Sequence, residues 1–140
     1  MEFAREAAAR NGLAERSTFL HGDAGETMAA LRASGERFGF VVLDPSAFAK
    51  ARAHAGMARR AYATLNELAL GLVSPGGFLY SCSCTPWVGV SGLAGIANAA
   101  ARSAGRRIRL VEVRGASRDH PPHAAMPETA YLAGTLWYVD

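Results

Sequence analysis

Three short segments of this 140-residue chain carry residue types that could do chemistry, and each follows a stretch expected to be a strand. They are Gly22-Asp23-Ala24, Asp44-Pro45-Ser46-Ala47-Phe48 and Cys82-Ser83-Cys84-Thr85-Pro86. Aspartate supplies a carboxylate that accepts hydrogen bonds, and cysteine supplies a thiolate, the nucleophile of covalent catalysis. Ligands of an open α/β sheet bind beyond the carboxyl ends of its strands, so the three segments predict one site at a shared edge.

Each segment also has a purely structural explanation. Asp23 suits the cap of a helix, Asp44-Pro45 suits an ordinary turn, and a cysteine at a strand end is often a small buried hydrophobic residue. The two cysteines are separated by Ser83 alone, which is too close for an unstrained disulfide, and a four-cysteine zinc site is excluded. Their joint placement at one edge favours the functional interpretation.

Alternating helices and strands position these segments. Helices are predicted at 2–11, 26–33, 57–73 and 91–104, and strands at 17–21, 38–43, 77–82, 107–113 and 131–139. The strand at 38–43 is apolar on both faces, which is typical of a buried parallel strand. Strands separated by helices predict an α/β domain with a mostly parallel sheet and helices on both faces. The loop between the last two strands predicts that the final strand is antiparallel.

The composition fits one soluble domain. Half of the residues are hydrophobic and 19% are charged, which excludes global disorder. No apolar run approaches the roughly 20 residues that a membrane span needs, and the first residues lack the apolar core of a signal peptide, so a cytoplasmic location is expected. The net charge is +3, and a basic cluster that could attract phosphate or coat a solvated helix end comprises Arg102, Arg106, Arg107, Arg109, Arg114 and Arg118.

Four motifs follow one another along the chain: the stretch from Asp44 to Lys50, residues 75–77 with 82–85, residues 119–121, and residues 127–132. They resemble Asp-Pro-Pro-Ala-Phe-Ala-Lys, Pro-Gly-Gly with Cys-Ser-Cys-Ser, Asp-His-Pro, and Pro-Glu-Thr-x-Tyr-Leu. These are motifs of class I S-adenosylmethionine-dependent methyltransferases, in particular the bacterial family that methylates carbon 5 of a cytosine in large-subunit ribosomal RNA. The resemblance covers nearly the whole chain and implies a Rossmann-like methyltransferase fold.

The resemblance also implies a role for each residue at the predicted edge. The thiolate of Cys84 would add to carbon 6 of cytosine, so that carbon 5 can attack the methyl group of S-adenosylmethionine, while Asp44 would hydrogen-bond the ring. Cys82 would be structural, and the arginine cluster would hold RNA phosphates. The implied cofactor-binding residues are Gly22, Asp23, Ala24, Asp44 and Pro45. The implied substrate-binding residues are Ser46, Phe48, Lys50 and His120, and no metal is implied.

Three departures from the family pattern stand out. Ser46 replaces the second proline, which loosens the loop that would frame the base. Residues 86–90 replace a pair of histidines and an acidic helix start, so a base beside Cys84 is missing from the pattern. Residues 1–20 contain no glycine-rich loop after a strand, so residues 1–140 are expected to be a partial methyltransferase domain that lacks the first strand, loop and helix and the second strand. Exposed strand edges would then favour a homo-oligomer.

Other functions remain open at this point. The chain could be a non-catalytic remnant or binding module that keeps the fold without binding the cofactor. It could be an adenine amino-group methyltransferase, since such enzymes also use an Asp-Pro-Pro-aromatic loop and need no cysteine. A different nucleotide-binding α/β domain is disfavoured by the pairing of the Asp44–Lys50 stretch with Cys84.

Overall fold

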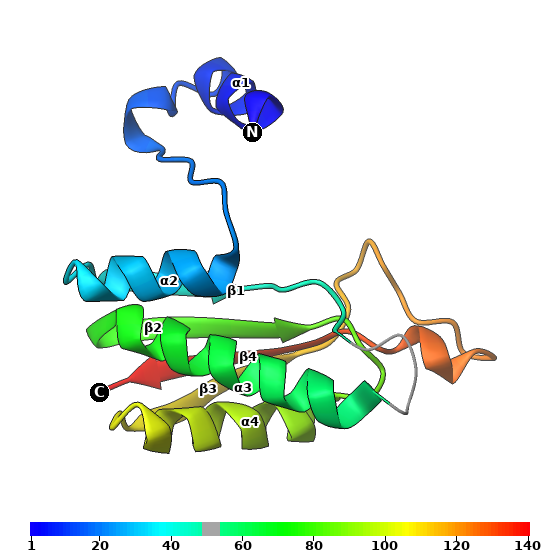
Figure 1. The fold of residues 1–140 in the computed structure, drawn as a ribbon. Helices are drawn as coiled ribbons and strands as arrows, with labels where there is room; N and C mark the ends of the chain where they lie inside the picture. Colours follow the sequence, from blue (N-terminus) through cyan, green and yellow to red (C-terminus); the bar gives the residue numbers. More distant parts are fainter. Residues whose placement is uncertain (49–53) are drawn as a thin grey trace.

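The computed structural model describes residues 1–48 and 54–140, and its centre is a four-stranded mixed sheet in the order β1-β2-β4-β3. The strands are β1 (Phe38–Leu43), β2 (Val73–Ser83), β3 (Ile108–Arg114) and β4 (Ala133–Val139). β1 is parallel to β2, and β4 is antiparallel to both β2 and β3. Three strands therefore share one direction, and the expected antiparallel final strand is confirmed, inserted between β2 and β3 (Figure 1).

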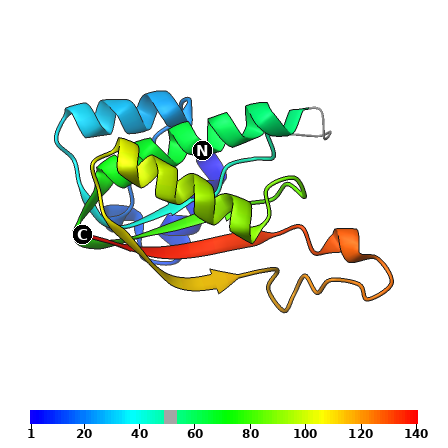
Figure 2. The ribbon, with the colours of Figure 1, turned by 90° about the horizontal axis from the view of Figure 1, so that it is seen from below.

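The helices are α1 (Glu2–Arg10), α2 (Ala24–Ala33), α3 (Ala55–Leu72) and α4 (Val90–Ser103), with short 3-10 turns η1 (Ala14–Arg16) and η3 (Pro127–Thr129). α3 and α4 pack on one face of the sheet, and α2 packs on α3 (Figure 2). α1 lies outside this layer, beyond the β1 edge (Figure 1). The 3.6-residue period of the chain from 57 to 73 is confirmed by α3, whose apolar side faces the sheet.

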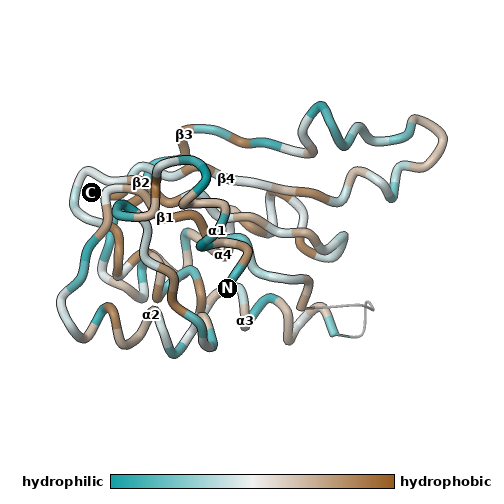
Figure 3. Tube along the Cα trace, turned by 90° about the horizontal axis from the view of Figure 1, so that it is seen from above, coloured by the Kyte–Doolittle hydropathy of each residue, from teal (hydrophilic) through white to brown (hydrophobic). Residues whose placement is uncertain are grey.

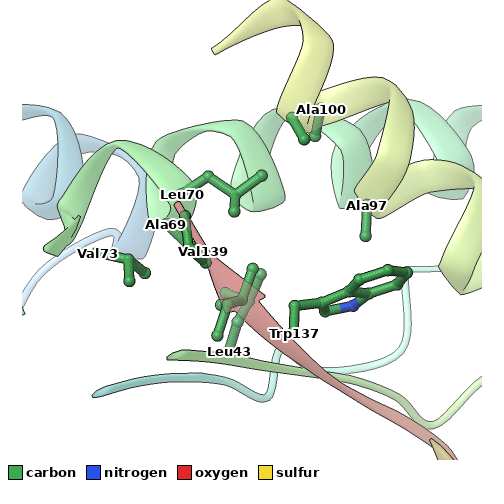
Figure 4. Close-up of a cluster of buried hydrophobic side chains, with 10 residues drawn as sticks. Leu43, Ala69, Leu70, Val73, Ala97, Ala100, Trp137 and Val139 are labelled. Carbon is green, nitrogen blue, oxygen red and sulfur yellow. The ribbon is translucent and has the colours of Figure 1, made fainter. Parts of the chain in front are cut away.

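The core fills the space between this helix layer and the sheet. The side chains of Trp137 and Val139 extend from β4 toward the helices (Figure 4), and Leu79 of β2 belongs to the same buried cluster. Small residues of the helices, such as Ala97 and Ala100 of α4, pack against these side chains, and their small size lets the helices approach the sheet closely. β4 lies in the middle of the sheet because its alternating residues reach this core.

The turn from α3 into β2 explains the sequence Pro75-Gly76-Gly77. Gly76 has a φ of +80°, a left-handed conformation that favours glycine. A Cβ atom on Gly77 would lie 2.7 Å from the carbonyl oxygen of Gly39, so only glycine allows β2 to approach β1 at this point. The two glycines therefore set the start of the register between the parallel strands.

The opposite face of the sheet carries aromatic side chains. Phe78 contacts Phe40 across β1 and β2, with ring centroids 6.3 Å apart, and contacts Tyr138 of β4 at 5.6 Å. Phe40 is 54% exposed and Val42 is 60% exposed. Figure 3 shows hydrophobic stretches along these strands. The sheet thus presents apolar surface on the side away from α3 and α4.

Two sequence-based expectations are wrong at the β1 edge. Residues 17–21 form no strand within the described chain; they run as an extended connection from η1 to α2 (Figure 1). The segment 38–43 is a strand as predicted, but of its residues only Leu43 is buried. The physical reasons differ: residues 17–21 have no strand beside them among the described residues, whereas Phe40 and Val42 of β1 lie on the face of the sheet away from α3 and α4.

Candidate active site at the carboxyl edge of the sheet

The carboxyl ends of β1 and β2 bring two of the predicted segments together. Asp44 and Pro45 follow β1 directly, and Cys84 follows β2. The Cys84 thiol donates to the carbonyl oxygen of Pro45 across a Sγ–O distance of 3.7 Å, although 39 positions separate the two residues in sequence. Parallel pairing of β1 with β2 aligns their ends, and this produces the contact.

The third segment joins the first two through a cavity of about 480 Å³, here called the helix-side cavity. Its wall from α2 includes Asp23 and Ala24, and its wall from the loop after β1 includes Pro45, Ser46 and Phe48. α3 closes the side with Ala61, Thr64 and Leu65. This volume lies in the usual range of small-molecule sites, and most of the lining is apolar. Residues from two of the three predicted segments thus line a single hollow, while Asp44 and Cys84 are not part of its lining.

Asp23 serves two purposes in this arrangement. Its Oδ1 accepts a hydrogen bond from the backbone N–H of Glu26 at 3.0 Å and caps α2, as its structural explanation predicted. The same residue lines the helix-side cavity. Gly22 precedes it, with Thr27 Oγ1 only 3.2 Å from where a Cβ would stand, and is not part of the lining. The cap therefore fixes a carboxylate at the mouth of the cavity.

Tyr62 is a residue of the site that sequence reasoning did not single out. It is fully buried, and its ring packs edge-on against Phe48 with centroids 5.0 Å apart. Burial raises the pKa of the Tyr62 hydroxyl, opposed by the neighbouring Ser83 and supported by Cys84. The helical period placed Tyr62 on the core face of α3, which predicts burial but not its position beneath Phe48 and Cys84.

The two cysteines lie in different surroundings. Cys82 is within β2, half-buried, and lines a second cavity of about 230 Å³ that also includes Asp44 and Tyr80, here called the cysteine cavity. Burial, with a smaller contribution from the charge of Asp44, raises the pKa of the Cys82 thiol to about 11. Cys82 is therefore a poor nucleophile near neutral pH, which agrees with its predicted structural role.

Of the remaining predicted site residues, one lines the helix-side cavity, one lies apart from both cavities, and one falls outside the described residues. Ser46 is exposed at the helix-side cavity. His120 lies in the exposed loop after β3, where its Nε2 is 3.3 Å from the Tyr131 hydroxyl and its ring packs edge-on against Tyr131. Neither lining includes His120. Lys50 falls in residues 49–53, outside the described residues.

One arginine of the basic cluster makes hydrogen bonds to backbone carbonyls and does not contribute to a charged surface. Arg106 donates from Nη1 to the carbonyl oxygens of Leu70 and Val73 at 3.0 and 2.8 Å, and from Nε to the Asp140 carbonyl at 3.0 Å. Burial, and to a lesser degree Arg37, lowers its pKa. Arg106 is thus committed to the carbonyls where α3 ends.

The described residues bring together no group of three or more histidine, cysteine, aspartate or glutamate side chains able to hold a metal ion. Within the same part of the chain, no helix is both long and apolar enough to cross a membrane.

Relatives of this chain are found among proteins named as ribosomal RNA methyltransferases. The chain is 37% identical over 137 residues to ribosomal RNA large subunit methyltransferase I of Aeromonas salmonicida, covering 97% of this chain and 35% of that protein. It is 36% identical to the protein of the same name from Aeromonas hydrophila, with 97% and 34% covered, and 35% identical to that of Yersinia pseudotuberculosis, with 85% and 30% covered. The chain spans about a third of the length of these curated relatives. No protein-family profile matches the chain.

Solved structures give the fold. A crystal structure of SMU.776, described as a methyltransferase complexed with SAH, superposes with a TM-score of 0.67 at 13% identity, covering 84% of this chain and 30% of that one. A protein from Streptococcus mutans described as a SAM-dependent methyltransferase gives 0.66 at 12% identity, with 84% and 29% covered. The fold is Rossmann-like, of the methyltransferase type. The predicted fold class is therefore confirmed.

Proposed function

We propose that this chain is part of an S-adenosylmethionine-dependent RNA methyltransferase that acts on large-subunit ribosomal RNA, as the names of its relatives indicate. The observation that carries the proposal is the meeting of Cys84 with the Asp44-Pro45 turn at the edge of the sheet, 3.7 Å apart at Sγ and the Pro45 oxygen. A nucleophile and a hydrogen-bonding carboxylate beside a ligand-sized cavity are the parts that methylation of a pyrimidine carbon needs.

The helix-side cavity is the proposed cofactor site. Its fit to S-adenosylmethionine rests on its volume of about 480 Å³, its apolar walls and the Asp23 carboxylate, which can accept hydrogen bonds from the adenosine part. Asp23 and Ala24 would hold that part, with Gly22 shaping the turn, while Asp44 and Pro45 would face the reacting end. When bound, S-adenosylmethionine supplies an electrophilic methyl group on sulfur.

The proposed chemistry is covalent catalysis at carbon 5 of cytosine. The Cys84 thiolate forms a bond to carbon 6, and the electron pair displaced onto the ring makes carbon 5 nucleophilic. Carbon 5 would then be methylated, because bound S-adenosylmethionine would supply the methyl group and its sulfur would keep the electron pair of the broken bond. A base then removes the proton from carbon 5 while the bond from carbon 6 to Cys84 breaks, which regenerates the thiolate. Asp44 hydrogen-bonds the ring, and Ser46, Phe48, Lys50 and His120 contact the substrate.

A covalent trap tests this function. The chain is incubated with S-adenosylmethionine and RNA containing 5-fluorocytidine, whose fluorine cannot leave as a proton does, so the link from carbon 6 to the thiol persists. We expect a protein–RNA adduct in the unmodified chain and in Cys82→Ser, and none in Cys84→Ser. Mass spectrometry of the adduct peptide identifies the linked residue.

The matched serine variants separate the alternatives. Methyl transfer that survives in Cys84→Ser would reject the cysteine mechanism in favour of an adenine amino-group methyltransferase. Failure of the unmodified chain to form an adduct or transfer a methyl group would leave the chain as a non-catalytic binding module and overturn the proposal.

A further inference from the structure

A groove of about 720 Å³ lies on the face of the sheet opposite α3 and α4, and the proposed chemistry makes no use of it. We call it the arginine groove. Side chains alternate between the two faces of the sheet along each strand. Leu79 and Trp137 enter the core, so Tyr80, which follows Leu79, lies on the opposite face. Glu112 and Arg114 pair with β4 positions that alternate with Trp137, so they share the face of Tyr80. The loop from Gly115 to Arg118 forms the remaining wall.

The groove continues into the candidate active site. Tyr80, Gly115 and Ser117 line both the arginine groove and the cysteine cavity. The cysteine cavity also contains Asp44, whose neighbour Pro45 contacts Cys84. A chain molecule with one residue at Cys84 can therefore place its next residues along this hollow.

The charges of the groove suit a phosphate backbone. Glu112 Oε1 accepts from both Nε and Nη2 of Arg114 at 2.8 Å, which holds this guanidinium along the wall with the side chain 65% exposed. Arg118 is exposed, and none of the residues that the structure describes forms an ion pair with it. The lining of the groove therefore contains two positively charged side chains, Arg114 and Arg118, and one carboxylate, Glu112. The ring of Tyr80 lines both this groove and the cavity that contains Asp44, and it offers an aromatic surface for a base.

The other arginines of the cluster lie at the far end of the sheet. Arg109 donates to Asp140 at 2.9 Å and its guanidinium lies 4.8 Å from the centre of the Tyr138 ring. Arg107 lies 3.9 Å from the same carboxylate, and its side chain is 89% exposed. β3 runs in the same direction as β1 and β2. Arg114, at the end of β3, therefore lies at the carboxyl edge of the sheet, and Arg107 and Arg109, at its start, lie at the opposite edge. One run of basic sequence thus supplies two separate surfaces.

We propose that the arginine groove binds the backbone of single-stranded RNA beside the target nucleotide, with Arg114 and Arg118 on successive phosphates and Tyr80 stacked on a neighbouring base. The proposal rests on the proposed function, because it takes RNA as the substrate. Stacking and phosphate contacts need no particular sequence, so the groove orients the strand while the active site selects the base.

The test measures how salt weakens binding of a short fluorescent oligocytidylate RNA, by anisotropy, between about 50 and 200 mM salt. Each lost phosphate contact is expected to reduce the slope of log affinity against log salt by about 0.7. Arg114→Gln and Arg118→Gln should each show this loss, and together about twice the loss. Arg107→Gln, which removes the same charge from the opposite end of the sheet, is the matched control and should leave the slope unchanged.

A further variant predicts the opposite sign. Glu112→Gln removes the negative charge of the groove and releases Arg114, so it should tighten RNA binding, a result that misfolding would not produce. Equal losses in Arg107→Gln and Arg118→Gln would show a general charge effect and overturn the proposal, as would absence of RNA binding at low salt. Adduct formation at Cys84 with an unchanged slope in the groove variants would reject the groove alone. A changed slope with no dependence of methyl transfer on Cys84 would reject the cysteine mechanism alone.

Discussion

The two cysteines show how strongly position within a few ångströms changes a residue. Cys82 lies inside β2, where burial and Asp44 raise its pKa to about 11. Cys84 lies past the strand, against the Pro45 carbonyl at the open edge. A thiol reacts through its thiolate, so the surroundings of Cys82 within β2 make it a poor nucleophile near neutral pH.

Thiol alkylation tests this difference. In Cys84→Ser, Cys82 is the sole cysteine, and its raised pKa leaves about a hundredth of the thiolate that an ordinary thiol of pKa 9.0 has near neutral pH. Iodoacetamide should therefore modify the folded variant about 100-fold more slowly than the same variant unfolded in denaturant. The rate should rise with pH toward about 11. Equal rates in the folded and unfolded chains would contradict the assignment.

The same pKa gives a sign for stability in alkali. The folded thiol titrates near 11 and the unfolded thiol near 9.0, so folding opposes its ionisation. This contribution to the free energy of unfolding is complete below about pH 9 and is lost as the pH rises toward 11.

At the scale of elements, a single guanidinium joins the ends of a helix and two strands. The last carbonyls of a helix lack intrahelical partners, and a cation at that end is also favoured by the helix dipole. Arg106 supplies both to α3 through Leu70 and Val73, and it holds the residue that follows β4 through the Asp140 carbonyl. This side chain therefore links the end of α3, the start of β2 and the end of β4 through hydrogen bonds.

Arg106→Ala is expected to destabilise the fold by about 2 kcal/mol, because it leaves partly buried carbonyls without their charged donor. Urea denaturation followed by circular dichroism measures the change. Arg107→Ala removes the neighbouring, almost fully exposed arginine and should change stability by no more than about 0.5 kcal/mol. Equal effects of the two substitutions would show that the carbonyl contacts contribute little.

At the scale of the whole molecule, both edge strands of the sheet, β1 and β3, expose apolar side chains. β1 pairs with β2 only, and its Phe40 and Val42 are more than half exposed, the largest exposed fractions on either edge together with Val111 of β3. An unpaired strand with apolar side chains is a template for pairing with another chain. We therefore propose that isolated copies of residues 1–140, interpreted as a partial methyltransferase domain, associate through β1.

Light scattering over a range of protein concentrations measures this association. We expect a mass that grows with concentration, and a shift toward the monomer in Val42→Lys, since an edge lysine resists pairing. Val113→Lys places the same charge on β3 at the opposite edge and should leave the association unchanged. A monomer at every concentration, or an equal effect of the two lysines, would contradict the assignment to β1.

The sequence alone predicted what depends on neighbours along the chain. Periodicity located α3, a short run of apolar residues predicted β1 at 38–43, and the order of elements predicted that Asp44 and Cys84 would follow strand ends at one edge of the sheet. Their contact follows because parallel strands bring their carboxyl ends to one edge. Only the tertiary structure decided which strands pair and which side chains are in contact. Residues 17–21 pair with no strand among the described residues, and Tyr62 packs against Phe48. The arginines of the basic cluster lie at the two ends of β3. Strand pairing and side-chain contacts depend on residues far away in sequence, and a local pattern does not identify those partners.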